Sequence, residues 1–329
     1  METALGYLAP YLARMSDGET GDRHLWVTPA IDSFRANPDV EMVHDGNWTD
    51  YDDTARWRVR EGVTLDPDNI RLHYTLSFER SFPAFRELRG RFGRSDLRFQ
   101  VGIPAPIDLA LYTFGDVVFS DASILNACTL ATAREIKEIF AIGGEEVVFQ
   151  IETVVALVGV AQAPTEQQAA VAKQMADAII GLVALASERS HFGLHLCLGD
   201  FHHKAYGKMR DVGPMVQLAN AIIDGWPDGR TLDYLHAPFA AAAEPPIADE
   251  AFYTPLEQLR LPEQVRFVAG FLHEDLDLPA HQQLLARIEG LLGREVDIAA
   301  ACGLGRRDTN EEAFEQMRET AALIESRTD

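Results

Sequence analysis

The stretch LHLCLGDF, residues 194–201, alternates apolar side chains with side chains that can bind a metal. Leucines stand at positions 194, 196 and 198, and His195 and Cys197 stand between them. This period of two is typical of a β-strand, so His195 and Cys197 are expected on the same face. An imidazole and a thiol side by side are good ligands for Zn²⁺. The stretch therefore predicts a strand that carries two metal ligands.

A second stretch, ACGLGRR at residues 301–307, follows another apolar run, residues 296–301. Cys302 could supply a second thiolate to the same metal ion. The ion would then lie at the ends of neighbouring strands, which is where catalysis occurs in a parallel α/β barrel.

Strand-like and helical segments alternate along the chain from about residue 80. Glycines 143 and 144 are expected to stop one helix, and Thr165 is expected to N-cap another, with Gln168 as its capping-box partner. The patterns predict strands at residues 97–103, 146–151, 193–198, 231–236, 265–272 and 296–301, and helices at 78–92, 121–142, 165–189, 212–226, 256–259, 279–292 and 310–326.

Such alternation predicts βαβ units and a parallel sheet, hence the α/β class. A closed barrel takes about 250 residues, so we expect a single (β/α)8 TIM-type barrel domain over residues 1–329. Residues 1–75 are irregular and rich in Asp, Trp and Arg, and are expected to form an N-terminal elaboration at the barrel mouth. An open doubly wound sheet is the alternative, but no glycine-rich turn follows a first strand.

The composition, 47% hydrophobic and 24% charged residues, is that of a globular enzyme. A net charge of -22 repels nucleic acid and anionic membranes, so neither is expected as a partner. No run of 18 apolar residues and no signal peptide are found. Three cysteines are too few for a disulfide framework and indicate the cytoplasm, and Cys128 is expected to be a packed core residue.

These segments resemble the zinc-bearing catalytic domain of cobalamin-independent methionine synthase, the coenzyme M alkyltransferases and, more remotely, uroporphyrinogen decarboxylase. The resemblance rests on His195-Leu196-Cys197 with Phe201, and on residues 302–306, CGLGR. It implies a (β/α)8 barrel in which these two patterns hold a catalytic zinc. Weaker similarities are residues 16–23 (SDGETGDR), 102–106 (GIPAP) and 150–152 (QIE), the last at a place where the synthases hold their amino acid substrate through acidic residues.

The chain departs from the family pattern in two respects. Full-length synthases carry a second, N-terminal barrel that helps to bind polyglutamyl folate, and this chain is too short for it. The synthases also use a glutamate as a zinc ligand on the strand after His-x-Cys. Here that strand reads TLDYLH, residues 231–236, so His236 falls near the place of the glutamate. Either His236 is the replacement ligand, or the site has three protein ligands.

The expected chemistry is activation of a thiol. A free thiol has a pKa of about 8.5 and is mostly protonated at neutral pH, whereas binding to Zn²⁺ deprotonates it. Catalytic zinc commonly keeps three protein ligands and one exchangeable position, a requirement that His195, Cys197 and Cys302 meet. A thiol substrate in that position would become a thiolate that attacks an alkyl carbon.

Further polar residues are candidates for supporting roles. Asp200 could orient a ligand or bind substrate. Glu152 and Glu19 could hold a substrate amine or transfer protons, and His273, expected at the same rim, could do either. The candidates for substrate binding are Glu19, Arg23 and Arg306. Arg306 and its neighbour Arg307 could bind an anionic group or pair with carboxylates of the protein. Glu19 could instead pair with Arg23. His202 and His203 are expected to be solvated.

The favoured hypothesis is zinc-dependent transfer of a methyl or other alkyl group to or from a thiol, with a small-molecule thiol and an alkyl donor as partners. One alternative is a barrel lyase, decarboxylase or hydrolase in which the metal activates water or a carbonyl. Another is a metabolite-binding protein with a structural zinc, for which a closed shell of four protein ligands is expected.

Overall fold

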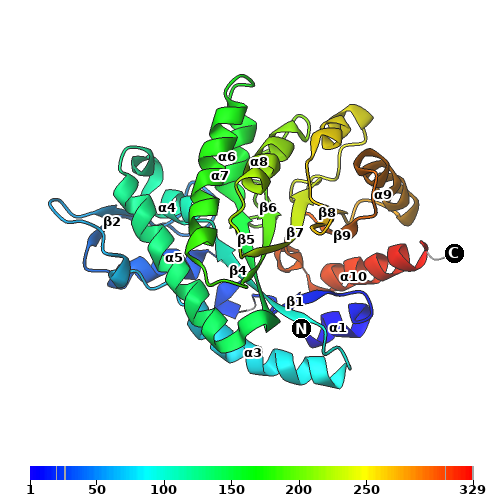
Figure 1. The fold of residues 1–329 in the computed structure, drawn as a ribbon, viewed down its shortest axis with the longest axis horizontal. Coiled ribbons are helices and arrows are strands. Elements are labelled where there is room, and N and C mark those ends of the chain that lie inside the picture. The colour runs from blue at the N-terminus through cyan, green and yellow to red at the C-terminus, as the bar shows by residue number, and fades with distance from the viewer. Residues whose placement is uncertain (20, 26, 308, 328–329) are drawn as a thin grey trace.

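A seven-stranded parallel sheet forms the centre of the computed structural model, which describes residues 1–19, 21–25, 27–307 and 309–327. The strands lie in chain order and curl into part of a barrel (Figure 1). They are β1 (Arg14–Ser16), β4 (Arg98–Pro104), β5 (Val147–Thr153), β6 (His191–Leu196), β7 (Thr231–Pro238), β8 (Arg266–Leu272) and β9 (Asp297–Ala300). All six neighbouring pairs are parallel. The consecutive order differs from a doubly wound sheet, in which the strand order reverses.

The sheet differs from the predicted eight-stranded barrel at its two ends. All six predicted strands are present and β1 is a seventh, but no ladder joins β9 to β1 among the described residues. These two terminal strands have only three and four residues, so they offer few backbone groups for closing the sheet. The structure therefore shows a curled parallel half-barrel.

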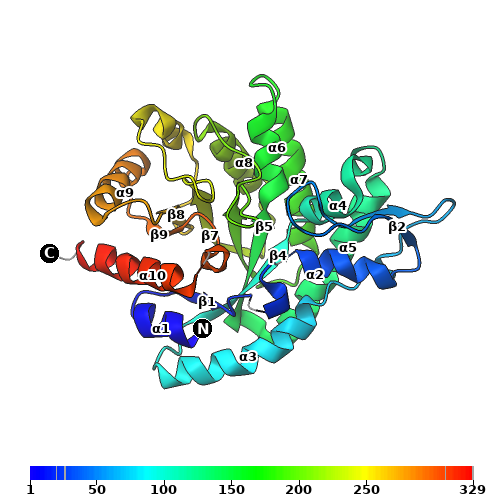
Figure 2. The same cartoon turned by 180° about the vertical axis from the view of Figure 1, so that it is seen from behind.

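Helices cover the outer surface of the sheet (Figures 1 and 2). The α-helices are α1 (Glu2–Leu8), α2 (Thr28–Asp32), α3 (Tyr74–Arg91), α4 (Pro106–Phe114), α5 (Ala122–Gly143), α6 (Val154–Gln162), α7 (Gln168–Leu185), α8 (Gly213–Asp224), α9 (Leu278–Leu292) and α10 (Asn310–Glu325). Helices α1 and α10 pack together, so the two ends of the described chain lie side by side.

The helix predictions are confirmed for the long segments, with three differences. Helices α4 and α6 were not predicted, and the segment near residue 256 is a 3-10 turn, Thr254–Gln258. The residue before α7 is Gln167, without a side-chain cap, so the Thr165 capping box is wrong. Gly144 follows α5 with a φ of 54°, which confirms the predicted glycine stop.

The N-terminal segment is more regular than predicted and contributes to the barrel. It supplies α1, β1, α2 and a hairpin, β2 (Val40–His44) and β3 (Arg56–Val59), which lies beside α4 (Figure 1). The loop between β2 and β3 contacts the loop after β6: the Tyr51 hydroxyl donates to the Lys204 carbonyl at 3.0 Å, and His202 Nε2 lies 3.0 Å from the Trp48 carbonyl. The elaboration thus reaches the segment that follows Cys197.

A buried tyrosine fills the inside of the curled sheet. Tyr234 is 1% exposed, and its hydroxyl donates to Gln150 Oε1 at 2.7 Å. Gly193 on the adjacent strand leaves room for it, because a Cβ atom at residue 193 would lie 1.9 Å from Tyr234 Cζ. Tyr234 therefore forms a floor two residues below His236 on β7.

One described helix, α7, is long and apolar enough to cross a membrane by length and composition alone. Its side chains at Ile179, Leu182 and Val183 are buried, and the helix packs against α6 and α8. Its outer surface carries an exposed ion pair, Lys173–Asp177, with Nζ and Oδ2 2.7 Å apart. These contacts are those of a core helix in a globular domain.

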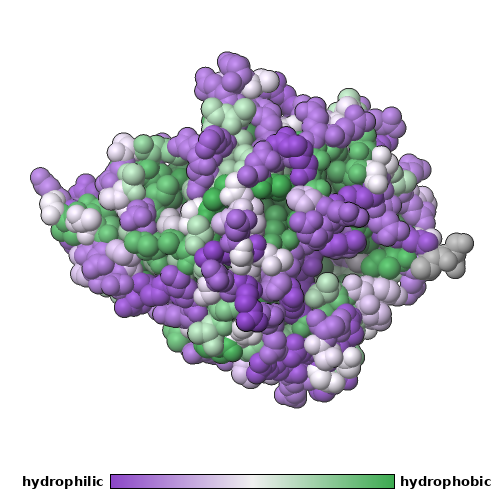
Figure 3. Space-filling view, in the orientation of Figure 1, coloured by the Kyte–Doolittle hydropathy of each residue, from purple (hydrophilic) through white to green (hydrophobic). Residues whose placement is uncertain are grey.

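Polar side chains cover most of the molecular surface seen in Figure 3, with apolar groups scattered between them.

Candidate metal centre

The structure brings together three of the four residues that the sequence offered as metal ligands. The ligand atoms of His195, Cys197 and Cys302 all lie within 4.8 Å of one another. His195 lies near the end of β6 and Cys197 directly after it, while Cys302 comes from the loop after β9. His195 and Cys197 are each 3% exposed.

The spacing of the sulfur atoms fits a zinc ion. Cys197 Sγ and Cys302 Sγ are 3.8 Å apart. Zn–S bonds of about 2.3 Å in tetrahedral geometry place two sulfur atoms about 3.8 Å apart. Two thiolates and one imidazole are a donor set that zinc prefers, and three protein ligands leave one coordination position for a substrate. The residues present therefore fit zinc in a catalytic type of site.

His236 lies beside this group, and both of its ring nitrogens have other partners. Its Nε2 is 3.0 Å from the Ala300 carbonyl, which can only accept, so Nε2 carries the proton. Its Nδ1 is 2.6 Å from Nδ1 of His195 and accepts a hydrogen bond from it. Burial and the charge of His195 lower the pKa of His236, which keeps it neutral. His236 thus lies next to His195 and outside the group of three candidate ligands, and its predicted role as a possible fourth ligand stays a prediction.

This hydrogen bond selects the tautomer of His195. With Nδ1–H donated to His236, the lone pair of a neutral His195 is on Nε2. The same Nε2 lies 3.6 Å from Glu152 Oε2. A ligating histidine commonly donates its second ring nitrogen to a partner in this way, which fixes the direction of the ring.

A hydrogen bond joins the two cysteines, with Cys197 Sγ donating to Cys302 Sγ at 3.8 Å. The hydrogen bond from Cys197 is the main cause that lowers the pKa of Cys302 far below its usual value, and His195 adds to it. The same hydrogen bond, with burial, raises the pKa of Cys197. The backbone N–H of Gly199 also donates to Cys197 Sγ, at 3.3 Å. The site therefore stabilises one thiolate before any cation binds.

Two carboxylates converge next to the ligands, over Gly102. A Cβ atom at residue 102 would lie 3.0 Å from Glu19 Oε1 and 3.2 Å from Glu152 Oε1. Burial and the charge of Glu152 raise the pKa of Glu19 to about 8, and burial is also the main cause that raises the pKa of Glu152. Gln150 Nε2 donates to Glu152 Oε1 at 2.7 Å. Two acidic groups in this state can bind a cationic group or share a proton.

The predicted arginines have different roles. Arg23 pairs with Asp17, with Nη2 and Oδ2 2.5 Å apart, and the Glu19–Arg23 pair is not among the ion pairs of the described chain. Arg306 has no ion pair within 4.0 Å in the part of the chain that the structure describes, and its charge lowers the pKa of Glu19 and of Cys302. Arg306 is therefore the candidate for binding an anionic group. Thr20, within the 16–23 stretch, lies outside the described residues.

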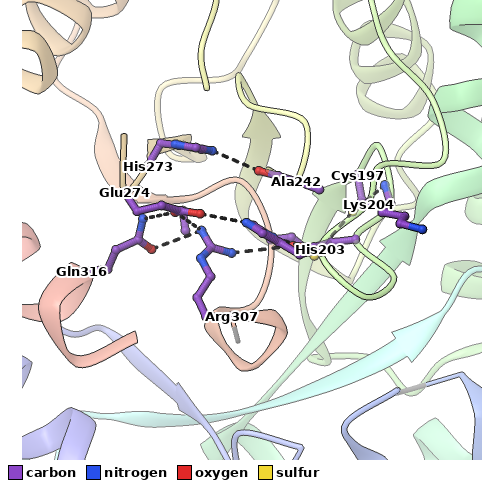
Figure 4. Close-up of polar contacts among 12 residues, drawn as sticks. Cys197, His203, Lys204, Ala242, His273, Glu274, Arg307 and Gln316 are labelled. Atoms are coloured by element: carbon purple, nitrogen blue, oxygen red, sulfur yellow. Dashed lines mark hydrogen bonds and ion pairs between the residues drawn. The ribbon is translucent and has the colours of Figure 1, made fainter. Parts of the chain in front are cut away.

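Three histidines predicted from the loops and strand ends form structural contacts. His273 is 1% exposed; its Nε2 donates to the Ala242 carbonyl at 3.1 Å, and its Nδ1 accepts from the Asp275 N–H at 3.2 Å (Figure 4). Both ring nitrogens of His273 are thus hydrogen-bonded to the backbone, and its catalytic role stays a prediction. His203 is not solvated as predicted, because Nε2 lies 2.8 Å from Glu274 Oε1, and His202 contacts the 45–55 loop.

Asp200 and Cys128 complete the account of the predicted residues. Asp200 is 8% exposed and lies among charged groups that include Arg307 and His203. Cys128 is fully buried within α5, and burial raises its pKa to about 12, as expected of a packed thiol. The sequence did not indicate that Gly102, within the GIPAP stretch of residues 102–106, leaves room for the carboxylates of Glu19 and Glu152.

The curled parallel sheet with its covering helices is a fold that this chain shares with solved structures. No family model and no curated protein matches the sequence. Among solved structures, a protein described as a vitamin-B12-independent methionine synthase from Listeria monocytogenes aligns with a TM-score of 0.61 at 13% identity. The B12-independent methionine synthase from Shewanella sp. W3-18-1, solved in complex with selenomethionine, aligns with a TM-score of 0.62, also at 13% identity. Each alignment covers 99% of this chain and 85% of the other. The likeness shows a shared fold over almost the whole chain.

Proposed function

We propose that this protein is a zinc-dependent enzyme that transfers a methyl or other alkyl group between a donor and a small-molecule thiol, in the mouth of a barrel of the (β/α)8 type. The observation that carries the proposal is the convergence of His195, Cys197 and Cys302, with all ligand atoms within 4.8 Å. The shared fold with B12-independent methionine synthases supports it.

Zinc held by these three residues would supply an open coordination position that lowers the pKa of a thiol substrate. The protein contributes the geometry of that site. His236 fixes the tautomer and direction of His195, and Cys197 and Cys302 would supply two thiolates to the same ion. Two thiolate ligands would neutralise the formal charge of Zn²⁺ and so keep a thiol substrate more nucleophilic than three neutral ligands would.

The surrounding charges favour an amino acid thiol as substrate. The carboxylates of Glu19 and Glu152, which converge over Gly102, would hold a substrate ammonium group. Arg306, without an ion pair of its own among the described residues, would bind a carboxylate of the substrate. An α-amino acid carries both of these groups. The Shewanella protein of the same fold was solved with an amino acid bound, selenomethionine.

A direct test begins with bound metal. We expect about one zinc per chain by elemental analysis of protein purified without added metal or chelator. In Cys197→Ser we expect the metal content to fall and methyl transfer to homocysteine, assayed with methylcobalamin as the donor probe, to be lost. The matched control is Cys128→Ala, in a buried thiol remote from the ligand group, which should keep both.

The alternatives give different results. Wild-type protein with no zinc, and none taken up on soaking, would refute the proposal. Turnover of a substrate in the absence of any thiol would indicate a lyase or hydrolase instead. Zinc coordination that stays unchanged when thiols are added would indicate a structural metal, which normally has four protein ligands.

A further inference from the structure

Arg307 and Asp200 are buried charged residues that join the two loops carrying the cysteines. Asp200 follows Cys197 by three residues, and Arg307 follows Cys302 by five. Their side chains are 1% and 5% exposed, and Arg307 Nη1 lies 3.7 Å from Asp200 Oδ2. Burial of opposite charges at this distance makes their attraction much stronger than that of a surface pair.

Arg307 also fastens its loop to two other elements (Figure 4). Its Nη2 lies 3.0 Å from Oε2 of Glu274, which follows β8, and 3.4 Å from Oε1 of Gln316 on α10. Gln316 Nε2 in turn donates to Glu274 Oε2 at 3.2 Å. One guanidinium therefore holds the loop of Cys302 against α10, the end of β8 and the loop of Cys197.

His203 closes these contacts into a ring. Its Nε2 is 2.8 Å from Glu274 Oε1, and its Nδ1 is 3.6 Å from Asp200 Oδ1. Negative Asp200, positive Arg307, negative Glu274 and the His203 imidazole then follow one another around the ring. Both oxygens of Asp200 lack a hydrogen bond, so the nearby charges of His203 and of Arg307 compensate this buried carboxylate.

Within the described part of the Cys302 loop, the backbone hydrogen bonds are turn contacts, from the Arg306 N–H to the Gly303 carbonyl and from the Arg307 N–H to the Leu304 carbonyl. Strand β9 ends at Ala300, and Gly303 and the 3-10 turn Leu304–Arg306 lie between Cys302 and Arg307. A cysteine on such a loop keeps its distance to Cys197 only if both loops are tied together. The sulfur spacing of 3.8 Å is the distance that the tie has to preserve.

We propose that Arg307 and Asp200 are positioning residues, whose buried charge pair holds the Cys197 and Cys302 loops at the separation that one metal ion requires. The inference rests on the proposed function only in that it assumes metal binding at this site. It assigns to Arg307 a role in metal geometry that is separate from substrate binding by its neighbour Arg306.

The test uses the full chain loaded with Co²⁺, whose thiolate charge-transfer absorption reports how many sulfur ligands are bound. Arg307→Met keeps the apolar stem and removes the charge. We expect it to lose about half of the charge-transfer intensity, as one of two thiolates leaves, and to bind the metal 10- to 100-fold more weakly, within the range found for residues that support ligands. Arg307→Lys, which keeps a positive charge, should recover most of both.

The matched control is Arg134→Met. Arg134 also fastens a loop through a part-buried guanidinium, which donates to the Pro67 carbonyl at 2.9 Å, but it lies outside the ligand group. It should lower the midpoint of urea unfolding without changing the Co²⁺ spectrum. Should Arg307→Met fail to fold, Asp200→Asn removes the other charge at nearly constant volume and is expected to change the spectrum in the same direction.

Two results would overturn parts of the argument separately. A full two-thiolate spectrum and wild-type metal affinity in a folded Arg307→Met or Asp200→Asn protein would refute the positioning role. A wild-type protein that binds neither Co²⁺ nor Zn²⁺ would refute the metal site itself, and with it the proposed function.

Discussion

Replacement of His236 by leucine should show whether His236 binds the metal itself or only supports the candidate ligand His195. The structure gives His236 two buried hydrogen bonds, from His195 Nδ1 at 2.6 Å and to the Ala300 carbonyl at 3.0 Å. Leucine removes both and leaves a buried N–H and a buried C=O without partners. At about 1–3 kcal/mol for each unpaired group, the free energy of unfolding should fall by about 2–6 kcal/mol.

The effect on the metal should be smaller than the loss of a ligand. Loss of a hydrogen-bond partner of a ligating histidine weakens metal binding by about 10- to 100-fold, or about 1.4–2.7 kcal/mol. Glutamine at position 236 can accept from His195 and donate to Ala300, so His236→Gln should lie within a few-fold of wild type. The dissociation constant for Zn²⁺ is measured by competition with a chromophoric chelator.

His273→Leu is the matched control, because His273 is equally buried and also uses both ring nitrogens. It should lose comparable stability and keep the wild-type affinity for Zn²⁺. If His236→Gln and His236→Leu lost affinity equally and by several orders of magnitude, His236 would be a metal ligand and the supporting role would be wrong.

Three further predictions concern the carboxylates and the floor of the site. Burial and the charge of Glu152 raise the pKa of Glu19 from 4.5 to about 8, so the native state holds a proton that the unfolded state loses. The free energy of unfolding of the metal-free protein, measured in urea, should therefore fall as the pH rises from 4.5 toward 8, and this part of the pH dependence should be absent in Glu19→Gln. The same pH dependence in both proteins would contradict the prediction. Gly102→Ala places a methyl group 3.0 Å from Glu19 Oε1 and should lower kcat/KM by about ten- to a hundredfold at unchanged zinc content. An unchanged kcat/KM would contradict this prediction. Gly193→Ala places a methyl group 1.9 Å from Tyr234 Cζ and should lower the free energy of unfolding by about 3 kcal/mol in urea titrations; a wild-type midpoint would mean that the interior is less filled than described.

The strands could be predicted because their residues alternate or run apolar between clear turn signals. Helix α6 could not, since the apolar run from Val147 to Val160 continues across the junction at Thr153 without a turn residue. Helix α4 begins at Pro106, two residues after Pro104, where the predicted strand of residues 97–103 was expected to end, and no helix was predicted there. Closure of the sheet into a barrel would depend on pairing between β1 and β9, its two shortest strands. Pairing between segments so far apart cannot be predicted from a local sequence pattern.

The grouping of His195 and Cys197 as candidate ligands could be predicted because strand alternation puts their side chains on the same side. The roles of His236 and His273 could not, because their partners are the backbone carbonyls of Ala300 and Ala242, which any residue type supplies. The sequence also shows two adjacent arginines, Arg306 and Arg307, after Cys302, but it does not distinguish their roles. Only the fold shows that Arg307 is buried among charges, whereas Arg306 has no ion pair in the described chain.

The separation of Cys197 and Cys302 by 105 residues has a consequence for how the protein matures. A ribosome-bound chain that has released only β6 offers a cation one histidine and one thiol, and the second thiol emerges after β7 and β8 have formed. If the three candidate ligands bind a metal, its tight capture would therefore wait for the last strand to dock, and the ion would then tie that strand to the middle of the chain. Hydrogen exchange of the β9 and α10 amides should slow on metal addition, because opening of this end then requires release of the ion.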